Sequence, residues 1–368
     1  MTASSAALEA ALEPFRARSN REVQTILDAY EATRGSREYP SGRTLATSRK
    51  VLTAGKRYRY TLACLAYQGL TAWPDFEVAA RPAAWLELYH VYTLFLDDIM
   101  DEDERRRTLP SSWSTTAKAY RGKDAAQPGR LFRSVRQRYG ASMAILDALR
   151  IRSLAERAIQ GAEDLPSSVR VALLSELTDV DLVLSDGQGL DIDFEILDRV
   201  PEADYVRMSE AKTARLYLGA AATAAIAAGA GLGARQALEE YALRFAIAFQ
   251  DRDDLLGSGV VASRIGGSSE GDIRQGKRTR LYVLALDRLR GKDRASFLRA
   301  YGRGRRSTKA DIALIRRLLR DHVLPVMEAR ISENLRLARE ALDRIPPLDS
   351  AARDLLDALL DAQRTRVR

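Results

Sequence analysis

Apolar side chains recur at every third or fourth position along most of this chain, which is the spacing of amphipathic helices. The clearest segment runs from about residue 82 to 105, where the apolar stripe comprises Trp85, Leu88, Tyr89, Tyr92, Leu96 and Ile99. A second helix of this kind is predicted around Tyr241, Phe245 and Phe249. Strand patterns are nearly absent, and Gly and Pro interrupt the periodic stretches. The pattern therefore predicts an all-α protein.

Two aspartate clusters lie on these apolar segments: Asp97-Asp98-Ile-Met-Asp101 and Asp253-Asp254-Leu-Leu-Gly257. Positions 97 and 101 share one helix face, where two like charges destabilise a helix by about 0.2–0.5 kcal/mol unless a cation offsets them. Carboxylate oxygens without nearby His or Cys suit magnesium, which completes its octahedron with waters and substrate phosphate oxygens. A single run of this type is usually a solvated helix end. The presence of two favours a Mg²⁺ site that binds a phosphate ester.

Basic side chains accompany the aspartates. Residues 105–107 are three arginines, which either neutralise the acidic residues 102–104 or grip phosphate oxygens bidentately. Three further basic sites, at Lys56, Lys212 and Lys277, stand where helices are predicted to begin and where free N–H groups attract anions. His90, one of only two histidines, is placed two turns before the first aspartates on the same face.

Taken together and in this order, these elements resemble the polyprenyl diphosphate synthase family, the trans-isoprenyl diphosphate synthases, and most of all its bacterial geranylgeranyl diphosphate synthases. The resemblance spans nearly the whole chain, through GKRYR at 55–59, ELYH at 87–90, DDIMDEDERRR at 97–107, GQGLD at 187–191, KTA at 212–214, FQDRDD at 249–254 and GKRT at 276–279. It implies an isoprenoid synthase-type helical bundle with a central active-site cavity. We expect a single domain over residues 1–368, with an N-terminal helical region at 1–40 and a basic insertion at 118–138.

The resemblance also implies roles for individual residues. The expected metal ligands are Asp97, Asp101 and Asp253, and the catalytic set adds Asp98, Asp254 and Lys212. The expected ligands of isopentenyl diphosphate are Lys56, Arg59, His90 and Arg107. The expected ligands of the allylic diphosphate (dimethylallyl, geranyl or farnesyl) are Arg106, Lys212, Thr213, Gln250 and Lys277.

These roles imply head-to-tail prenyl transfer. Ionisation of the allylic C–O bond leaves a carbocation and a diphosphate, whose developing charge magnesium and fixed cations stabilise. The double bond of isopentenyl diphosphate then attacks the cation, and a proton is lost, for which the departing diphosphate is a plausible base. Apolar walls protect the cation because they exclude water.

Side chains upstream of the first cluster are expected to set the product length. In this family the product grows down the cavity from that cluster, and Tyr89, Tyr92 and Thr93 lie one to two turns upstream. One aromatic stop with a small neighbour favours geranylgeranyl diphosphate ahead of farnesyl diphosphate. The alternative is that both tyrosines are ordinary core residues.

Departures from the family pattern leave other functions open. Ser268 falls where many members carry a lysine for the allylic diphosphate. A terpene cyclase on the same fold is therefore the first alternative, followed by a prenyltransferase with a peptide or aromatic acceptor and by a non-enzymatic scaffold or regulatory subunit. The retained ligands of a second diphosphate, Lys56 and Arg59 among them, disfavour the cyclase.

The formal net charge of +8 raises the question of a nucleic-acid partner. Much of the excess lies in Arg294–Arg320, which contains no recognisable DNA- or RNA-binding motif, so we expect no such partner. A solvated helix face with a basic loop is the simplest interpretation. Attraction for diphosphate substrates, or transient contact with an anionic membrane surface, are the alternatives.

The location is expected to be cytoplasmic. Residues 216–234 are uncharged, but they are rich in Ala and Gly and too weakly apolar for a transmembrane helix. Cys64 is the only cysteine, so no internal disulfide forms, and Glu9 and Glu13 stand where a signal peptide would be apolar. The family resemblance implies a homodimer.

Overall fold

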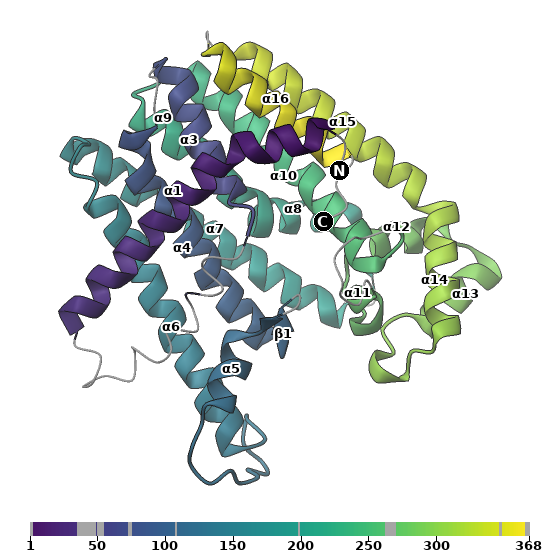
Figure 1. The fold of residues 1–368 in the computed structure, drawn as a ribbon. Helices are drawn as coiled ribbons and strands as arrows, with labels where there is room; N and C mark the ends of the chain where they lie inside the picture. The colour runs from purple at the N-terminus through teal and green to yellow at the C-terminus, as the bar shows by residue number, and fades with distance from the viewer. Residues whose placement is uncertain are drawn as a thin grey trace. The chain divides into compact units, whose positions relative to one another are not determined.

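The computed structural model describes residues 3–34, 49, 55–72, 76–106, 109–197, 199–261, 270–345 and 348–364, and it is helical almost throughout (Figure 1). This confirms the all-α prediction. The chain divides into two compact units. The first comprises Met1–Gln68, Trp73–Ser175 and Ile226–Gly229, and the second comprises Gly69–Ala72, Glu176–Ala225 and Ala230–Arg368. The single domain and its central cavity stay predictions.

The first unit is built around α4. Its elements are α1 (Ala3–Arg34), α3 (Tyr58–Thr71), α4 (Glu77–Met100), β1 (Arg105–Arg106), β2 (Leu109–Pro110), α5 (Ser112–Lys118), α6 (Val135–Gln160) and the first part of α7 (Ser167–Ile196); the end of α3 belongs to the second unit. Helix α4 packs along α6 and against α1. Residues 83–89 of α4 are all buried, and because successive side chains of a helix point about 100° apart, they cover every side of it. Because α4 is apolar nearly all round in this stretch, it forms the core of the unit.

Helix α4 ends at Met100, so the expected helix to about residue 105 is wrong at its C-terminal end. Glu102 takes a left-handed backbone conformation with φ of 53°, and the Asp103 N–H donates to the Asp98 carbonyl oxygen at 2.9 Å. Residues 101–106 are all charged, so a continued helix would bury no apolar surface there. The chain turns instead into the β1–β2 pair, in which Arg106 lies opposite Leu109.

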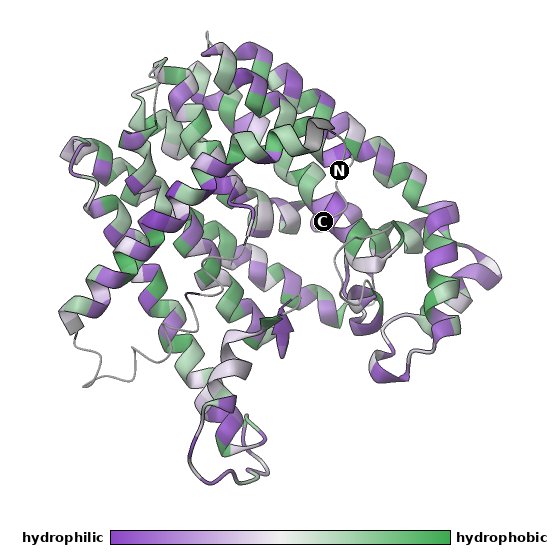
Figure 2. Ribbon diagram, viewed as in Figure 1, coloured by the Kyte–Doolittle hydropathy of each residue, from purple (hydrophilic) through white to green (hydrophobic). Residues whose placement is uncertain are grey.

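The second unit contains the rest of the helices. They are the remainder of α7, α8 (Glu202–Ser209), the π-helical turn η1 (Glu210–Ala214), α9 (Arg215–Ala227), α10 (Leu232–Ser258), α11 (Gly271–Gln275), α12 (Arg280–Arg288), α13 (Gly291–Ala300), the 3₁₀ turn η2 (Gly304–Arg306), α14 (Lys309–His322), α15 (Leu324–Arg344) and α16 (Ser350–Arg364). Helix α10 packs along α15, and α16 contacts both. Alternating apolar and polar colouring marks the amphipathic character of α15 and α16 (Figure 2). On α16 the buried face includes Leu356, Leu359 and Leu360.

The uncharged stretch at residues 216–234 is not one long helix. Helix α9 ends at Ala227, Gly229 takes a positive φ of 63°, and α10 begins at Leu232. None of the helices that the structure describes combines the length and the apolar character that crossing a bilayer requires. The expected cytoplasmic location stays a prediction.

Candidate active site

The first aspartate cluster lies at the C-terminal end of α4, within the first unit. The Asp101 N–H donates to the Asp97 carbonyl oxygen at 2.9 Å, so the two side chains lie one helical turn apart on the same face, as predicted. Both residues are partly exposed, whereas Asp98 is 2% exposed. The negative end of the helix dipole adds to the carboxylate charge. Asp97 and Asp101 therefore form a favourable site for a cation.

Arg106 binds both neighbouring aspartates of this cluster. Its Nε donates to Asp98 Oδ1 at 2.8 Å and its Nη2 donates to Asp97 Oδ2 at 2.7 Å. The Trp113 indole N–H donates to the carbonyl oxygens of Asp98 and Asp103, at 3.0 and 2.8 Å, and so fixes the turn after α4. Burial raises the pKa of the Asp98 carboxyl to about 6, although the Arg106 charge lowers it. Asp98 thus anchors Arg106 beside Asp97.

The oxygen donors of this cluster fit a magnesium ion that is bound together with a phosphate. Among the described residues, no three His, Cys, Asp or Glu side chains are grouped so that protein atoms alone could hold a metal ion. Magnesium commonly takes only one or two carboxylates and completes its shell with waters and substrate phosphates. Asp97 and Asp101 would supply those carboxylates, both of them hard oxygen ligands.

A buried ion pair holds the basic motif that precedes α3. Arg57 Nη1 donates to Glu87 Oε2 of α4 at 3.0 Å, with both side chains 3% exposed, and Arg57 Nε donates to Asn20 Oδ1 at 3.1 Å. Arg57 has a left-handed φ of 57°, which costs about 1–2 kcal/mol in a residue with a side chain. Moving Arg57 away would leave Glu87 buried and unpaired, at a cost of about 3–5 kcal/mol, so the pair keeps Arg57 in this conformation. It fixes the backbone between Lys56 and Arg59, both partly exposed.

The side chains expected to set product length form an aromatic row on α4. Tyr89 is 1% exposed, and its ring packs edge-on against Trp85 and Tyr92 with centroids 5.9 and 5.2 Å apart. The Thr93 hydroxyl donates to the His90 carbonyl oxygen at 2.8 Å. Tyr92 and His90 are partly exposed. Tyr89 is therefore a fixed core residue, and Tyr92 is the partly exposed end of the row.

In the second unit, two adjacent aspartates of α10 have different surroundings. Asp253 is partly exposed, whereas Asp254 is 3% exposed and accepts hydrogen bonds from three groups. These donors are Gln250 Nε2 at 2.8 Å, the Tyr205 hydroxyl at 3.0 Å and the Arg280 backbone N–H at 3.1 Å. Burial raises the pKa of the Asp254 carboxyl, while these hydrogen bonds lower it. Asp254 thus positions its neighbours, and Asp253 is the more accessible carboxylate.

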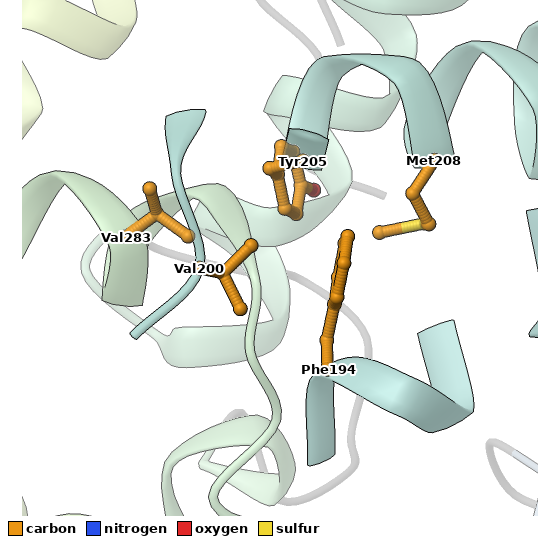
Figure 3. Close-up of a cluster of buried hydrophobic side chains, with 5 residues drawn as sticks. All are labelled: Phe194, Val200, Tyr205, Met208 and Val283. Atoms are coloured by element: carbon orange, nitrogen blue, oxygen red, sulfur yellow. The ribbon is translucent and has the colours of Figure 1, made fainter. Parts of the chain in front are cut away.

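An apolar cluster holds Tyr205 in place (Figure 3). The cluster consists of Phe194, Val200, Tyr205, Met208 and Val283. It joins the end of α7 to α8 and α12. The start of α12 is also fixed by Arg280, whose Nη1 donates to Asp251 Oδ2 at 2.8 Å. Burial raises the pKa of the Asp251 carboxyl to about 7, and the Arg280 charge opposes that rise.

The third acidic position of the second motif is Gly257, and Asp272 of α11 lies against it. A Cβ atom added at Gly257 would stand only 2.2 Å from Asp272 Oδ2. A carboxylate from another helix therefore fills the space that a side chain at position 257 would need. Asp272 has no role predicted from the sequence, although it stands just before the GKRT motif.

Lys212 and Thr213 were expected to begin a regular helix. They lie instead in the π-helical turn η1, directly before α9. Lys212 Nζ donates to Asp191 Oδ2 of α7, and the Thr213 hydroxyl donates to Gln250 Oε1 at 3.1 Å. Helix α7 can approach this turn because residue 187 is glycine: an added Cβ would stand 2.5 Å from the Lys212 backbone nitrogen. Single π-helical turns occur frequently at functional sites.

Lys277 lies in the short connection between α11 and α12, as predicted for a residue that precedes a helix. Gly276 before it has a φ of 77°, and an added Cβ there would stand 2.8 Å from the Gly302 Cα. The Tyr301 hydroxyl donates to the Lys277 carbonyl oxygen at 2.7 Å. These contacts fix the backbone that carries the lysine.

Hydrogen bonds join some of the predicted site residues within each unit. Arg106 joins the first cluster, and Gln250 joins Thr213 to Asp254. Arg107 and Ser268 lie outside the described residues. Four supporting residues were given no role from the sequence: Glu87, Asp191, Tyr205 and Asp272. Glu87 and Asp191 stand inside the ELYH and GQGLD motifs, and that position could have identified them. Nothing in the sequence around Tyr205 distinguishes it.

Comparison with known proteins gives consistent matches. A sequence model of the family described as "Polyprenyl synthetase" matches residues 44–319. The geranylfarnesyl diphosphate synthase of Aeropyrum pernix is 29% identical over 315 residues, which cover 84% of this chain and 90% of that protein. The short chain isoprenyl diphosphate synthase of Methanothermobacter thermautotrophicus is 31% identical over 318 residues, covering 86% of this chain and 88% of that protein. The fold is similar to a solved structure, the crystal structure of geranylgeranyl pyrophosphate synthase from Corynebacterium glutamicum complexed with isoprenyl diphosphate and magnesium. The TM-score is 0.85 and the sequence identity 26%, over 96% of this chain and 99% of that one.

The close approach at Gly187 predicts a specific loss of stability. We expect Gly187→Ala to destabilise the protein by about 1–3 kcal/mol, because the new methyl group overlaps the backbone of η1. Gly189→Ala is the matched control, since nothing lies within 4 Å of its added Cβ. It makes the same gain in helix propensity without a clash, so we expect it to stabilise the protein slightly. Urea unfolding measures both. Equal midpoints for the two variants would contradict the packing described here.

Proposed function

The chain belongs to the polyprenyl synthetase family, and on that premise we propose that it is a trans-prenyltransferase that joins isopentenyl diphosphate to an allylic diphosphate. The observation that carries the proposal is the pairing of accessible carboxylates with ordered basic sites. Asp97 is paired with Arg106 one helical turn from Asp101, and the ion pair of Arg57 orders a second basic site that has no role in ionising one diphosphate alone. A terpene cyclase would need only the first of these sites.

We propose that Asp97, Asp101 and Asp253 hold magnesium ions, which when bound would neutralise the charge that develops on the leaving diphosphate. Arg106, Lys212 and Lys277 would donate to oxygens of that allylic diphosphate, and Thr213 and Gln250, already joined by a hydrogen bond, would complete its contacts. Asp254 acts through Gln250, which it orients.

On the same proposal, Lys56, Arg59, His90 and Arg107 bind isopentenyl diphosphate. Lys56 and Arg59 flank the buried Arg57–Glu87 pair, so their backbone is fixed before substrate arrives. Such preorganisation lowers the entropic cost of orienting the second diphosphate.

We propose geranylgeranyl diphosphate as the product, with geranylfarnesyl diphosphate next. Tyr92 supports the shorter product, because it ends the aromatic row of α4 five residues before Asp97 and is backed by the buried Tyr89. Thr93 is too small to add a second obstruction. The relatives carry both product names, which supports a product in this range.

We propose that two copies of the chain associate through α6. One face of α6 exposes Ile145, Leu146 and Leu149 at 38%, 45% and 50%, while the opposite face is buried in the first unit. Contiguous exposed apolar side chains mark protein–protein contact surfaces more often than scattered ones do. A molar mass by light scattering of twice the 40.8 kDa chain would agree, and a monomer would contradict the proposal.

The reaction itself is the first test. Purified protein with magnesium is incubated with farnesyl diphosphate, with and without isopentenyl diphosphate, and the products are analysed by mass spectrometry. We expect longer linear diphosphates only when isopentenyl diphosphate is present, because the chain retains ligands for two diphosphates. Cyclic or volatile terpenes formed from farnesyl diphosphate alone would favour the cyclase instead.

The two aspartate clusters predict a separation between catalysis and folding. Asp97→Asn and Asp253→Asn should each lower turnover about a hundredfold or more, with little change in the unfolding temperature. Asp254→Asn should lower the unfolding temperature as well, because it disturbs a buried acceptor of hydrogen bonds. Glu104→Gln, at an exposed position near the first cluster, is the control and should retain turnover and metal dependence. Normal turnover by Asp97→Asn would remove the proposed metal site.

The aromatic row predicts an ordered change of product. Tyr92→Ala should lengthen the product by at least one isoprene unit, since it removes the exposed ring that would block growth. Tyr89→Ala alone should leave the product unchanged, because Tyr92 still stands before it, but the double variant should extend it further. Product profiles after dephosphorylation measure the effect. If Tyr92→Ala makes the wild-type product, both tyrosines serve packing only.

A further inference from the structure

The connection between α5 and α6, residues 119–134, forms an ordered loop of the first unit. It extends beyond the ends of these two helices (Figure 1). Ala126 pairs with Ser134 in an antiparallel bridge, the Gln127 N–H donates to the Arg133 carbonyl oxygen at 2.8 Å, and the Val135 N–H donates to the Ala125 carbonyl oxygen at 3.0 Å. The loop is therefore a closed hairpin with a defined apex.

The segment is strongly basic for its length. Residues 118–138 contain one acidic side chain, Asp124, and seven basic ones: Lys118, Arg121, Lys123, Arg130, Arg133, Arg136 and Arg138. Their formal charge of +6 compares with +8 for the whole chain. All seven basic residues are exposed. Asp124 pairs with Arg136 at 3.5 Å, so little negative charge remains to balance the others.

The apex of the loop is apolar at one position. Leu131 is 90% exposed, more than any other large apolar residue in the described part of the chain. It stands between Arg130 and Arg133 and follows Gly129, whose φ of 74° allows the turn. An isolated exposed leucine is common, and what sets this one apart is its place at the tip of a basic hairpin.

We propose that this hairpin docks the enzyme on an anionic membrane surface, with Leu131 entering the headgroup region and the arginines facing lipid phosphates. Basic side chains near such a surface are each attracted to it, and the attraction falls off within about 8–10 Å, so charges at an extended tip act most strongly. An apolar tip adds the interfacial insertion that charge alone does not provide.

A nucleic acid would match the charge but not the tip. Binding of single strands relies on aromatic rings on which bases stack. The two tyrosines of this region, Tyr120 and Tyr139, pack against each other with centroids 5.2 Å apart, and Phe132 is partly buried. Membrane docking is a property beyond the proposed reaction. The reaction supplies only a reason why docking is useful, because long prenyl products partition into membranes.

Co-sedimentation of the full chain with vesicles tests the docking. We expect binding to vesicles of phosphatidylcholine mixed with phosphatidylserine, weakening as salt rises, and no binding to phosphatidylcholine alone. Each basic residue near the surface contributes about fivefold, so Arg130→Ser with Arg133→Ser should weaken binding on the order of 25-fold. Leu131→Ser should weaken it too. Arg305→Ser with Arg306→Ser is the control, because it removes the same charge from exposed positions in the second unit and should leave binding intact.

Several outcomes would overturn the proposal. The first is equal binding of the protein to vesicles with and without phosphatidylserine. The second is a loss of binding in the Arg305/Arg306 control as large as in the Arg130/Arg133 variant. The third is wild-type binding by Leu131→Ser together with competition between an RNA duplex and the vesicles. Turnover is measured for every variant in vesicle-free buffer. We expect it to be unchanged, so a failure of docking is distinguishable from a failure of the proposed reaction.

Discussion

Buried carboxylates that must be paired are the constraint on which the rest of the structure depends. An ionised side chain removed from water is strongly destabilising unless hydrogen bonds and opposite charge replace its hydration. Each unit meets this demand with an arginine taken from a distant part of the chain: Arg57 for Glu87 in the first and Arg280 for Asp251 in the second. Because each pair joins two elements, the need to satisfy a charge also fixes the position of a loop. In both units that loop carries a lysine expected to bind diphosphate.

The two aspartate motifs share a division of labour between adjacent residues. Asp98 and Asp254 are buried and bound by protein donors, whereas Asp97, which also accepts from Arg106, and Asp253 are partly exposed. Helical geometry makes this possible, since successive side chains point about 100° apart and cannot share one environment. A doubled aspartate therefore supplies one carboxylate to the protein's own framework and leaves the other accessible, as the proposed metal site requires. The repeated pattern on two helices favours a common design over two accidental acidic helix ends.

The sequence alone was sufficient for the features that depend on local pattern. The apolar periodicity predicted helices, and the motif order predicted the family and the position of Lys277 before a helix. Features that depend on contacts between distant residues were not predictable in this way. The bond of Tyr205 to Asp254 joins residues 49 positions apart, and the carboxylate of Asp272 against Gly257 comes from another helix. The early end of α4 was missed because helix propensity is a weak guide once a segment has no apolar face to bury.

The three lysines expected to bind diphosphate all stand on irregular backbone. Lys56 precedes Arg57 with its left-handed φ, Lys212 lies in a π-helical turn, and Lys277 follows Gly276 with its positive φ. Regular helix would direct such side chains along a helix surface, toward its N-terminus, where they would pair with neighbours on the next turn. A break in the helix instead lets the lysine leave that surface while its backbone stays fixed by buried contacts. Such local strain is tolerated at functional sites because the surrounding structure over-determines it, and here the buried ion pair, the Gly187 contact and the Tyr301 hydroxyl do so. The packed helices thus provide the stability, and the irregular turns between them position the charges.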